Sequence, residues 1–232
     1  MFPTLHPDIR IQKLAIGKEQ APLLVIDNLV ADPDQLVNVA ARKHYAPTIR
    51  FYPGIRAQAP LSYHHFLTSE LRSILLGFFG LPDKSLRLSM CHFSLVTTPA
   101  KELAVIQRVP HVDSLEPTGL AAVHYLFKAN LGGTAFYRHR KTGFEYIDAS
   151  RKTEYFQSLE NENDGADMPN AEYINGDTPL FEQISKQESV YNRILIYRRN
   201  SLHSGCIAKD FVPDPNPRTG RLSINCFIDL GA

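Results

Sequence analysis

The sequence predicts a mainly β protein, an antiparallel sandwich or barrel with helices packed on one side. Two observations lead to this fold class. From Ser85 onward, short runs of alternating or β-rich character follow one another and are separated by turn sequences. Before residue 80, apolar residues instead recur at helical spacing. An N-terminal helical segment followed by many strands is typical of a sheet structure with its helices packed on one side.

The first 84 residues are expected to form an α+β support for the sheet structure. The run 23–26 (Leu-Leu-Val-Ile) is short and apolar, which indicates a buried strand. Asp32-Pro33-Asp34 predicts the start of a helix that runs to about Arg42, because Asp can cap free N–H groups and Pro suits the first turn. A second helix is predicted from Ser69, with these apolar residues at helical spacing: Leu71, Ile74, Leu75 and Phe78.

The segment 85–232 is expected to form the β core. The predicted strands cover 86–90, 107–113, 121–127, 193–197 and 222–228, with turns at 131–133, 141–143 and 214–217. A long insertion is expected at about 144–190, and its polar part 161–167 is predicted to be an exposed loop. No linker or repeat divides the chain, so residues 1–232 are expected to form a single domain.

The composition narrows the class of protein. With 44% hydrophobic and 21% charged residues, the chain has the balance of a globular protein and not of a disordered one. A formal net charge of +1 gives no global field for nucleic acid or an anionic membrane, and neither is expected as a partner. No apolar run is long enough to span a bilayer, and the start of the chain does not resemble a signal peptide. Cys91, Cys206 and Cys226 match no paired spacing, which favours a reducing, cytoplasmic location.

The segment Arg108-Val-Pro-His-Val-Asp-Ser114 carries the most informative chemistry. Residues two apart on a strand point to the same face, so His111 and Asp113 would project together. One imidazole and one carboxylate supply two of the three facial ligands of a non-haem iron site, which a distant histidine completes. His203, just past the apolar run 194–197, is the candidate for that third ligand. A histidine and an aspartate at this spacing also arise by chance, so the pair alone does not establish a metal site.

A second pattern lies near the C-terminus. Alternation along 221–228 puts Arg221, Ser223, Asn225 and Phe227 on one face of a strand and apolar residues on the other. An arginine two residues before a serine can hold a carboxylate through its planar fork with an added hydroxyl hydrogen bond. A buried cation needs such an anion, because an unpaired buried charge is costly.

These motifs together resemble the 2-oxoglutarate/Fe(II)-dependent dioxygenase superfamily, whose core is a double-stranded β-helix (a jelly roll, cupin-like). The passage Tyr125-Leu-Phe…Gly-Gly-Thr-Ala-Phe136 is similar to one found in prolyl-4-hydroxylase-like members. The sequence Gly-Gly-Thr-Ala-Phe-Tyr-Arg-His-Arg at 132–140 resembles a bacterial family of uncharacterised oxygenase-like proteins. The resemblance covers roughly 85–230, and the N-terminal third fits only loosely.

The resemblance implies a role for each of these residues. His111, Asp113 and His203 would bind Fe(II) and form the catalytic centre, and Arg221 with Ser223 would hold the distal carboxylate of the cosubstrate 2-oxoglutarate. Tyr125 would be a further cosubstrate contact. Two departures are evident: Phe127 stands where an asparagine is expected, and the Pro-rich loop 212–220 lengthens the gap before Arg221. Arg218 could compete with Arg221, but it lies in the predicted turn.

Several other residues can be interpreted either as structural or as functional. The basic run 138–141 could be a solvated hairpin tip or an anion-binding edge of the pocket. His64, His65 and His124 lack a carboxylate at ligand spacing, which favours surface or structural roles. Cys206 could be redox-sensitive, although such a residue is more often a small buried apolar one. Six aromatic residues of the insertion could form a substrate lid or a dimer contact, or attach the insertion to the barrel: Phe144, Tyr146, Tyr155, Phe156, Tyr173 and Phe181.

Three functional interpretations follow. The first is an oxygenase that uses O₂ to hydroxylate an amino acid, a peptide or a small metabolite. The second is a non-redox metal enzyme of the cupin type, which would have no need of a carboxylate anchor such as Arg221. The third is a barrel that binds without turnover, which Phe127 favours slightly. The substrate is left open, and so is whether the protein forms a homodimer.

Overall fold

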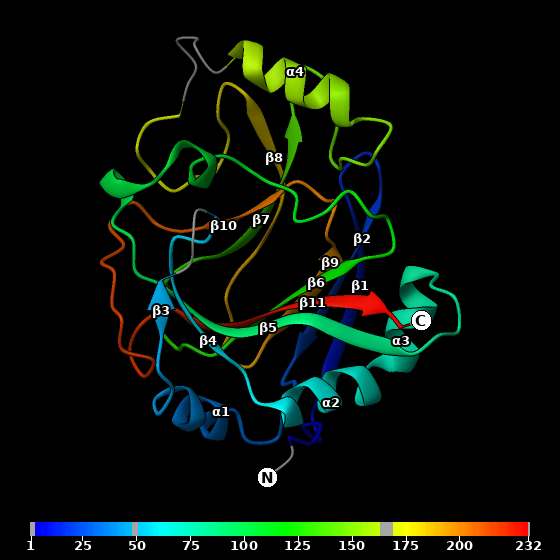
Figure 1. Cartoon of the computed structure of the whole chain (residues 1–232), viewed down its shortest axis with the longest axis vertical. Helices are drawn as coiled ribbons and strands as arrows, with labels where there is room; N and C mark the ends of the chain where they lie inside the picture. Colours follow the sequence, from blue (N-terminus) through cyan, green and yellow to red (C-terminus); the bar gives the residue numbers. More distant parts are fainter. Residues whose placement is uncertain (1–2, 48–50, 163–168, 232) are drawn as a thin grey trace.

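A computed structural model describes residues 3–47, 51–162 and 169–231. Its fold is a double-stranded β-helix made of an eight-stranded and a three-stranded antiparallel sheet (Figure 1). The strand order is β1-β2-β9-β6-β11-β5-β4-β3 in the major sheet and β10-β7-β8 in the minor sheet. The two sheets enclose a cavity, because residues of both line it. The mainly β class predicted from the sequence is confirmed.

The helices and strands have the following bounds: β1 Arg10–Ile16, β2 Ala21–Asp27, α1 Pro33–Ala40, β3 Ala46–Pro47, β4 Gly54–Gln58, α2 Leu61–Glu70, α3 Arg72–Phe79, β5 Leu86–Val96, β6 Leu120–Tyr125, β7 Gly133–His139, α4 Lys152–Glu162, β8 Phe181–Gln187, β9 Ile194–Arg198, β10 His203–Cys206 and β11 Leu222–Leu230. Two short 3₁₀ helices, Ala100–Glu102 and Val105–Gln107, lie between β5 and β6.

The N-terminal third contributes directly to the major sheet. β1 and β2 form a hairpin, and β2 pairs with β9, while β4 pairs with β5. The predicted strand at 23–26 is confirmed as the centre of β2. The predicted helix after Asp32 is confirmed as α1, where the Asp32 side chain accepts a hydrogen bond from the backbone N–H of Gln35 at 3.1 Å.

The second predicted helix differs from the structure. A helix was expected from Ser69, but the structure has two, α2 and α3, which break at Leu71. α2 follows Pro60 without a side-chain cap, so the sequence carries no N-cap signal for it. α3 ends at Gly80, whose φ of 60° is the left-handed conformation that glycine adopts readily at a helix C-terminus.

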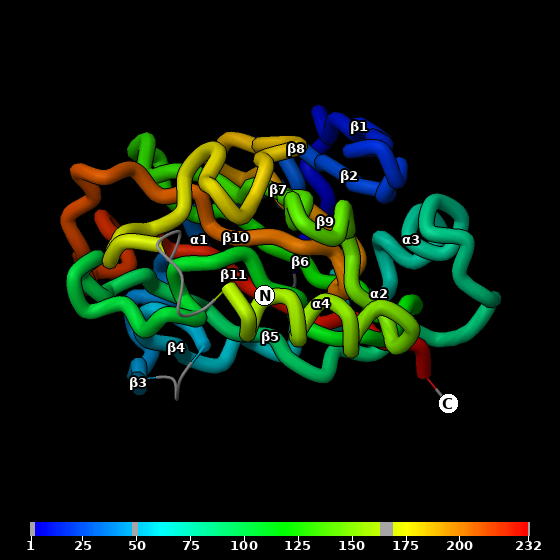
Figure 2. Tube along the Cα trace, turned by 90° about the horizontal axis from the view of Figure 1, so that it is seen from above, coloured from blue at the N-terminus to red at the C-terminus, as the bar shows by residue number. Residues whose placement is uncertain are grey.

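The helices of the first 80 residues pack on one face of the major sheet. Leu222, Ile224, Cys226 and Ile228 of β11 belong to the same buried cluster as residues of α1, α2 and α3. The predicted alternation along β11 is therefore correct, and its other face is turned toward the cavity. α4 lies at the opposite end of the molecule from α1 and α2, and in Figure 2 it is seen in front of the strands.

Two assignments made from the sequence need correction, one of a strand and one of an insertion. The segment 107–113 is not a strand, because a 3₁₀ helix ends at Gln107 and an irregular chain follows, with one isolated bridge between His111 and His203. The segment 144–190 is not wholly an insertion, because β8 pairs with β7 in the minor sheet. Of the predicted loop 161–167, residues 161 and 162 end α4, and 163–167 lie outside the described residues.

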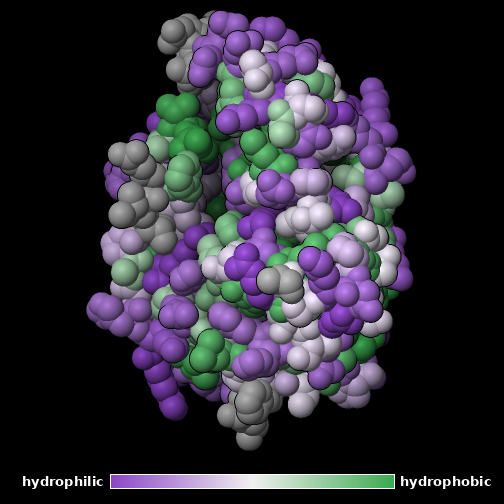
Figure 3. All heavy atoms as spheres, turned by 45° about the vertical axis from the view of Figure 1, so that its right-hand side comes forward, coloured by the Kyte–Doolittle hydropathy of each residue, from purple (hydrophilic) through white to green (hydrophobic). Residues whose placement is uncertain are grey.

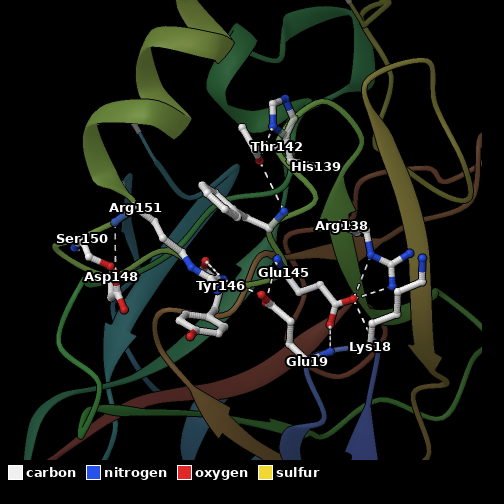
Figure 4. A network of polar contacts seen from close by, with 11 residues as sticks. Lys18, Glu19, Arg138, His139, Thr142, Glu145, Tyr146, Asp148, Ser150 and Arg151 are labelled. Atoms are coloured by element: carbon white, nitrogen blue, oxygen red, sulfur yellow. Dashed lines mark hydrogen bonds and ion pairs between the residues drawn. The ribbon is translucent and has the colours of Figure 1, made fainter.

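The basic run 138–141 is solvated only in its second half: Arg138 and His139 are buried, Arg140 and Lys141 are exposed, and none of the four lines the cavity. Arg138 donates to the carboxylates of Glu145 and Glu182. Glu145 also accepts from the backbone N–H groups of Lys18 and Glu19 (Figure 4). These contacts join the β1–β2 turn to the minor sheet. His139 lies against the carboxylate of Glu162 and Arg140 pairs with Asp177, so three of the four residues have acidic neighbours that the run itself did not reveal. Among the described helices, none is both long and apolar enough to cross a membrane.

Candidate metal centre

One carboxylate and two imidazoles converge in the cavity between the sheets. His111, Asp113 and His203 each offer a ligand atom, and these atoms all lie within 4.8 Å of one another. Asp113 Oδ1 is 3.8 Å from His111 Nε2, and Asp113 Oδ2 is 3.5 Å from His203 Nε2. The structure thus brings together the three residues that the sequence singled out, although they do not lie on a regular strand pair.

The backbone fixes the three side chains relative to one another. His111 and His203 exchange two hydrogen bonds, from His111 N to His203 O at 2.9 Å and from His203 N to His111 O at 3.0 Å. The Asp113 N–H donates to the carbonyl of Arg199 at 2.8 Å. The irregular segment is therefore attached to β10 and to the end of β9, and the two-residue spacing still projects His111 and Asp113 toward one point.

The tautomer of His203 follows from its surroundings. Its Nδ1 is 2.9 Å from the carbonyl oxygen of Ser201, which can only accept, so Nδ1 carries the proton. The Nε2 lone pair is then free on the side of Asp113. A histidine that ligates a metal usually donates its other N–H to a carbonyl or carboxylate in this way. Tyr197 packs against the ring, with centroids 4.7 Å apart.

His111 is neutral at physiological pH. Withdrawal from bulk water by the cavity walls lowers its pKa to about 4, and the neighbouring His203 acts in the same direction, while Asp113 opposes the shift and Arg56 adds to it. A neutral imidazole keeps a lone pair for a metal. Two imidazole nitrogens and one carboxylate oxygen are a donor set that suits a divalent first-row metal.

Arg221 lies in the same cavity wall, one residue before β11. It is 5% exposed, and its guanidinium is held by three carbonyls: Nε donates to Leu131, and Nη2 donates to Gly132 and Gly133. The ring of Phe127 lies 5.4 Å from the guanidinium carbon. Phe127, which stands where an asparagine was expected, thus packs against Arg221. No carboxylate of the described residues forms an ion pair with Arg221.

Ser223 and Tyr125 are placed differently from each other. Ser223 lines the cavity, and its hydroxyl donates to Asn225 Oδ1 at 2.7 Å. Tyr125 is buried behind the wall, where its hydroxyl is 2.6 Å from that of Thr134, and burial raises its pKa to about 12. Thr134, not Tyr125, lines the cavity. Tyr125 therefore reaches the cavity only through Thr134.

The cavity has a volume of about 530 Å³ and a largely apolar mouth. Phe51, Ile106 and Phe156 line it and are at the same time among the exposed large apolar side chains of the molecule. Figure 3 shows a hollow on this side with apolar side chains gathered along its edge. Of the insertion aromatics, Tyr155, Phe156 and Tyr173 line the cavity, whereas Phe144 and Phe181 pack in the minor-sheet core.

Arg56 of β4 was not identified from the sequence. It lines the cavity, and its guanidinium carbon lies 4.1 Å from the centroid of the Tyr52 ring. Burial lowers the pKa of Arg56, partly opposed by Tyr52 and Asp113. The sequence signal was weak, because a lone arginine in a short segment of the N-terminal third matches no motif.

The remaining candidates have structural roles. His124 is buried between Tyr63 and Asn192, with Nδ1 2.9 Å from the Tyr63 hydroxyl and Nε2 3.1 Å from Asn192 Oδ1. His64 and His65 lie on α2 and are not part of the metal cluster. Cys206 is buried in the minor-sheet core, and burial raises its pKa, as expected of a small apolar residue there.

The chain is similar to several solved structures. The chain is similar to HygX from Streptomyces hygroscopicus, solved with nickel, 2-oxoglutarate and hygromycin B bound, with a TM-score of 0.50, 12% identity, and coverage of 90% of this chain and 83% of that chain. It is also similar to the non-heme alpha ketoglutarate dependent epimerase SnoN from nogalamycin biosynthesis (TM-score 0.49, 12% identity, coverage 89% and 77%). A third similar structure is AviO1 from Streptomyces viridochromogenes Tue57 (TM-score 0.47, 10% identity, coverage 97% and 90%). At 12% identity, the likeness to HygX concerns the fold alone.

No curated protein matches the sequence. A protein-family model does match it, from residue 7 to residue 228, which is nearly the whole chain. The chain belongs to DUF6445, a family of unknown function.

Proposed function

We propose that this protein is an Fe(II)- and 2-oxoglutarate-dependent oxygenase whose metal ligands are His111, Asp113 and His203. The observation that carries the proposal is the convergence of these three donors in one cavity with a buried arginine that has no carboxylate partner among the described residues. HygX, which shares the fold, was solved with nickel and 2-oxoglutarate bound, and this supports the choice of cosubstrate.

The chain's own residues have separate tasks in this proposal. His111, Asp113 and His203 hold the metal and leave the remaining coordination positions for ligands. Arg221 binds the distal carboxylate of 2-oxoglutarate, with Ser223 beside it, and three backbone carbonyls and Phe127 hold the guanidinium in place. Tyr125 supports Thr134 in the cavity wall. When bound, iron supplies the activation of O₂, and the protein supplies ligand geometry and a shielded pocket.

The proposed reaction is hydroxylation of a small molecule or peptide. The mouth of the cavity is apolar, and Tyr155 and Phe156 of α4 reach it, so a substrate can be sequestered from water there. A non-redox metal enzyme is less favoured, because such chemistry has no use for a buried arginine at this position. A binding protein without turnover was favoured by Phe127, but that residue packs against Arg221, as a support for an anion site would.

Turnover of the cosubstrate tests the proposal. Purified protein with Fe(II), 2-oxoglutarate and O₂ should form succinate, because the proposed chemistry oxidatively decarboxylates 2-oxoglutarate. The His203→Ala variant should form none, and His65→Ala, which alters an exposed histidine outside the cluster, should match the wild type. Equal succinate formation by wild type and His203→Ala would refute the assignment.

A further inference from the structure

Arg56 lies on the cavity face of the major sheet, in line with Ser223. It pairs with Ser94 of β5, and Ser94 pairs in turn with Ser223 of β11. Residues paired across antiparallel strands point to the same face, and neighbouring strands are about 4.8 Å apart. Arg56 is therefore two strands from Ser223, on the same floor of the cavity. Arg56 and the three proposed metal ligands line the same cavity.

The guanidinium of Arg56 is short of partners inside the protein. Its Nη1 lies 3.6 Å from the sulfur of Met90, a weak acceptor, and its buried Nε has no hydrogen-bond partner. No carboxylate of the described residues forms an ion pair with it. Arg193 pairs with Asp27 and Arg199 with Asp229. Arg198 has no ion pair among the described residues but donates to two backbone carbonyls, whereas Arg56 has neither kind of acceptor there. A withdrawn cation without an anion is costly, which points to an anionic ligand.

The charges in the cavity leave room for one further anion. Among the described lining residues the charged side chains are Arg56, Arg221 and Asp113, which together carry one net positive charge. A divalent metal raises this to three, and the 2-oxoglutarate dianion returns it to one. One more negative charge, carried by the substrate, makes the filled cavity neutral. Because Arg221 is assigned to the cosubstrate, Arg56 is the cation left for it.

The rest of the cavity favours an apolar body for that anion. Its walls toward the mouth include Phe51, Ile106, Tyr155, Phe156 and Tyr173. Aromatic side chains around one or two charged groups are typical of pockets that bind small organic molecules, with the charged group setting orientation. The Nε of Arg56, which has no hydrogen-bond partner, and a neighbouring Nη form the planar fork that matches a carboxylate.

We propose that Arg56 is a specificity-determining residue that binds a carboxylate of the substrate, and that the substrate is a carboxylic acid with an apolar body. This inference rests on the proposed function for the assignment of Arg221 to 2-oxoglutarate. Bound in this way, the carboxylate is held on the floor beside the metal ligands, and the apolar body extends toward the mouth.

Matched acids and amides test the proposal. The probes are phenylacetate, 3-phenylpropionate and 4-phenylbutyrate with their primary amides, measured by ligand-observed NMR on the full chain with Zn(II), with and without 2-oxoglutarate. In the presence of 2-oxoglutarate, at least one acid should bind tenfold or more tightly than its amide. Arg56→Met should remove this preference and leave 2-oxoglutarate affinity within about twofold, because Arg221 is intact. Arg56→Gln is the second variant if Arg56→Met fails to fold, and Arg140→Met is the control.

The outcomes separate this proposal from the proposed function. Equal binding of every acid and its amide to the wild type, or an acid preference that survives in both Arg56 variants, overturns the role of Arg56. Loss of 2-oxoglutarate affinity in Arg56→Met overturns it too, because Arg56 would then hold the cosubstrate. If the wild type binds no 2-oxoglutarate but still prefers acids through Arg56, the oxygenase assignment fails and the carboxylate site stands.

Discussion

Buried charge is treated in opposite ways in two regions of this molecule. Around Glu145, the guanidinium of Arg138 pairs with two carboxylates, those of Glu145 and Glu182. Glu145 also accepts hydrogen bonds from two backbone N–H groups (Figure 4). In the cavity, Arg221 is held by carbonyls and Arg56 by a thioether and a ring, and neither forms an ion pair with a described carboxylate. The first region is complete without a ligand, whereas the second is not.

The buried histidines differ in the same way. Asn192 Oδ1 accepts from Val30 N–H and so also from His124 Nε2, which leaves His124 Nδ1 to accept from Tyr63. Both ring nitrogens of His124 are thus satisfied. His203 uses only Nδ1, and its Nε2 faces Asp113. Polar groups left incomplete together in one cavity indicate a binding site, because buried polar groups elsewhere in proteins are nearly always paired.

Removing a proposed metal ligand should give the largest effect. Asp113→Ala should abolish metal-dependent turnover and weaken metal binding more than about a hundredfold, since loss of a group that only orients a ligand already costs about 10- to 100-fold. Metal titration followed by calorimetry measures it, with Asp8→Ala, which alters an exposed aspartate, as the control. Unchanged metal affinity in Asp113→Ala would remove Asp113 from the site.

Breaking the complete region should instead cost stability. Arg138→Met leaves the carboxylate of Glu145, which is 1% exposed, without its cation, and the free energy of unfolding should fall by about 3 kcal/mol. Arg140→Met, which breaks the exposed pair with Asp177, should cost no more than about 1 kcal/mol. Urea unfolding of both variants measures the difference. Equal losses of unfolding free energy would show that the buried pair stabilises the protein no more than the exposed pair does.

Buried His124, whose two ring nitrogens are both hydrogen-bonded, predicts a pH dependence of stability. Burial lowers the pKa of His124 from 6.5 to about 4. Between these two pH values His124 is therefore protonated in the unfolded chain but not in the folded chain. Stability should be complete above pH 6.5 and fall by up to about 3 kcal/mol as the pH drops to about 4. His124→Gln should lose that share of the pH dependence, whereas other titrating groups contribute to both proteins alike. Parallel pH profiles of unfolding free energy in the two proteins would contradict the prediction.

A conservative substitution of Arg221 in the cavity should have the smallest effect on ligand binding. Arg221→Lys keeps the charge but loses the planar fork, so 2-oxoglutarate should bind about ten- to a hundredfold more weakly, or roughly 1.5–3 kcal/mol. Metal affinity without 2-oxoglutarate should hardly change, because Arg221 is not a proposed ligand. Calorimetric titration checks both quantities, and unchanged cosubstrate binding would mean that Arg221 is not the anchor.

Where the sequence carried local signals, the fold was predictable. Asp32 before Pro33 marked α1, and the alternation along 221–228 separated the core face of β11 from its cavity face. α2 was missed because it has no side-chain cap. The segment before Asp113 was expected to be a strand, since its apolar residues alternate, but only His111 forms a bridge.

The site was predictable only in part, for a related reason. The two-residue spacing of His111 and Asp113 and the motif around Arg221 can be read locally. Arg56 joins them only because β4 lies beside β5 and β5 beside β11, an order set by tertiary pairing between distant segments. The acids that neutralise Arg138 likewise come from elsewhere in the chain, so a basic run alone could not reveal whether it was solvated or buried.

An anaerobic titration with Fe(II) and 2-oxoglutarate tests the central claim most directly. If the cavity is incomplete because it awaits a metal and a dianion, the wild type should develop the weak visible metal-to-ligand charge-transfer band of an iron–2-oxo-acid chelate. The band should saturate at one equivalent of each, fail to form in Asp113→Ala, and require more 2-oxoglutarate in Arg221→Lys. A wild-type protein that binds Fe(II) but shows no band at saturating 2-oxoglutarate would contradict the claim.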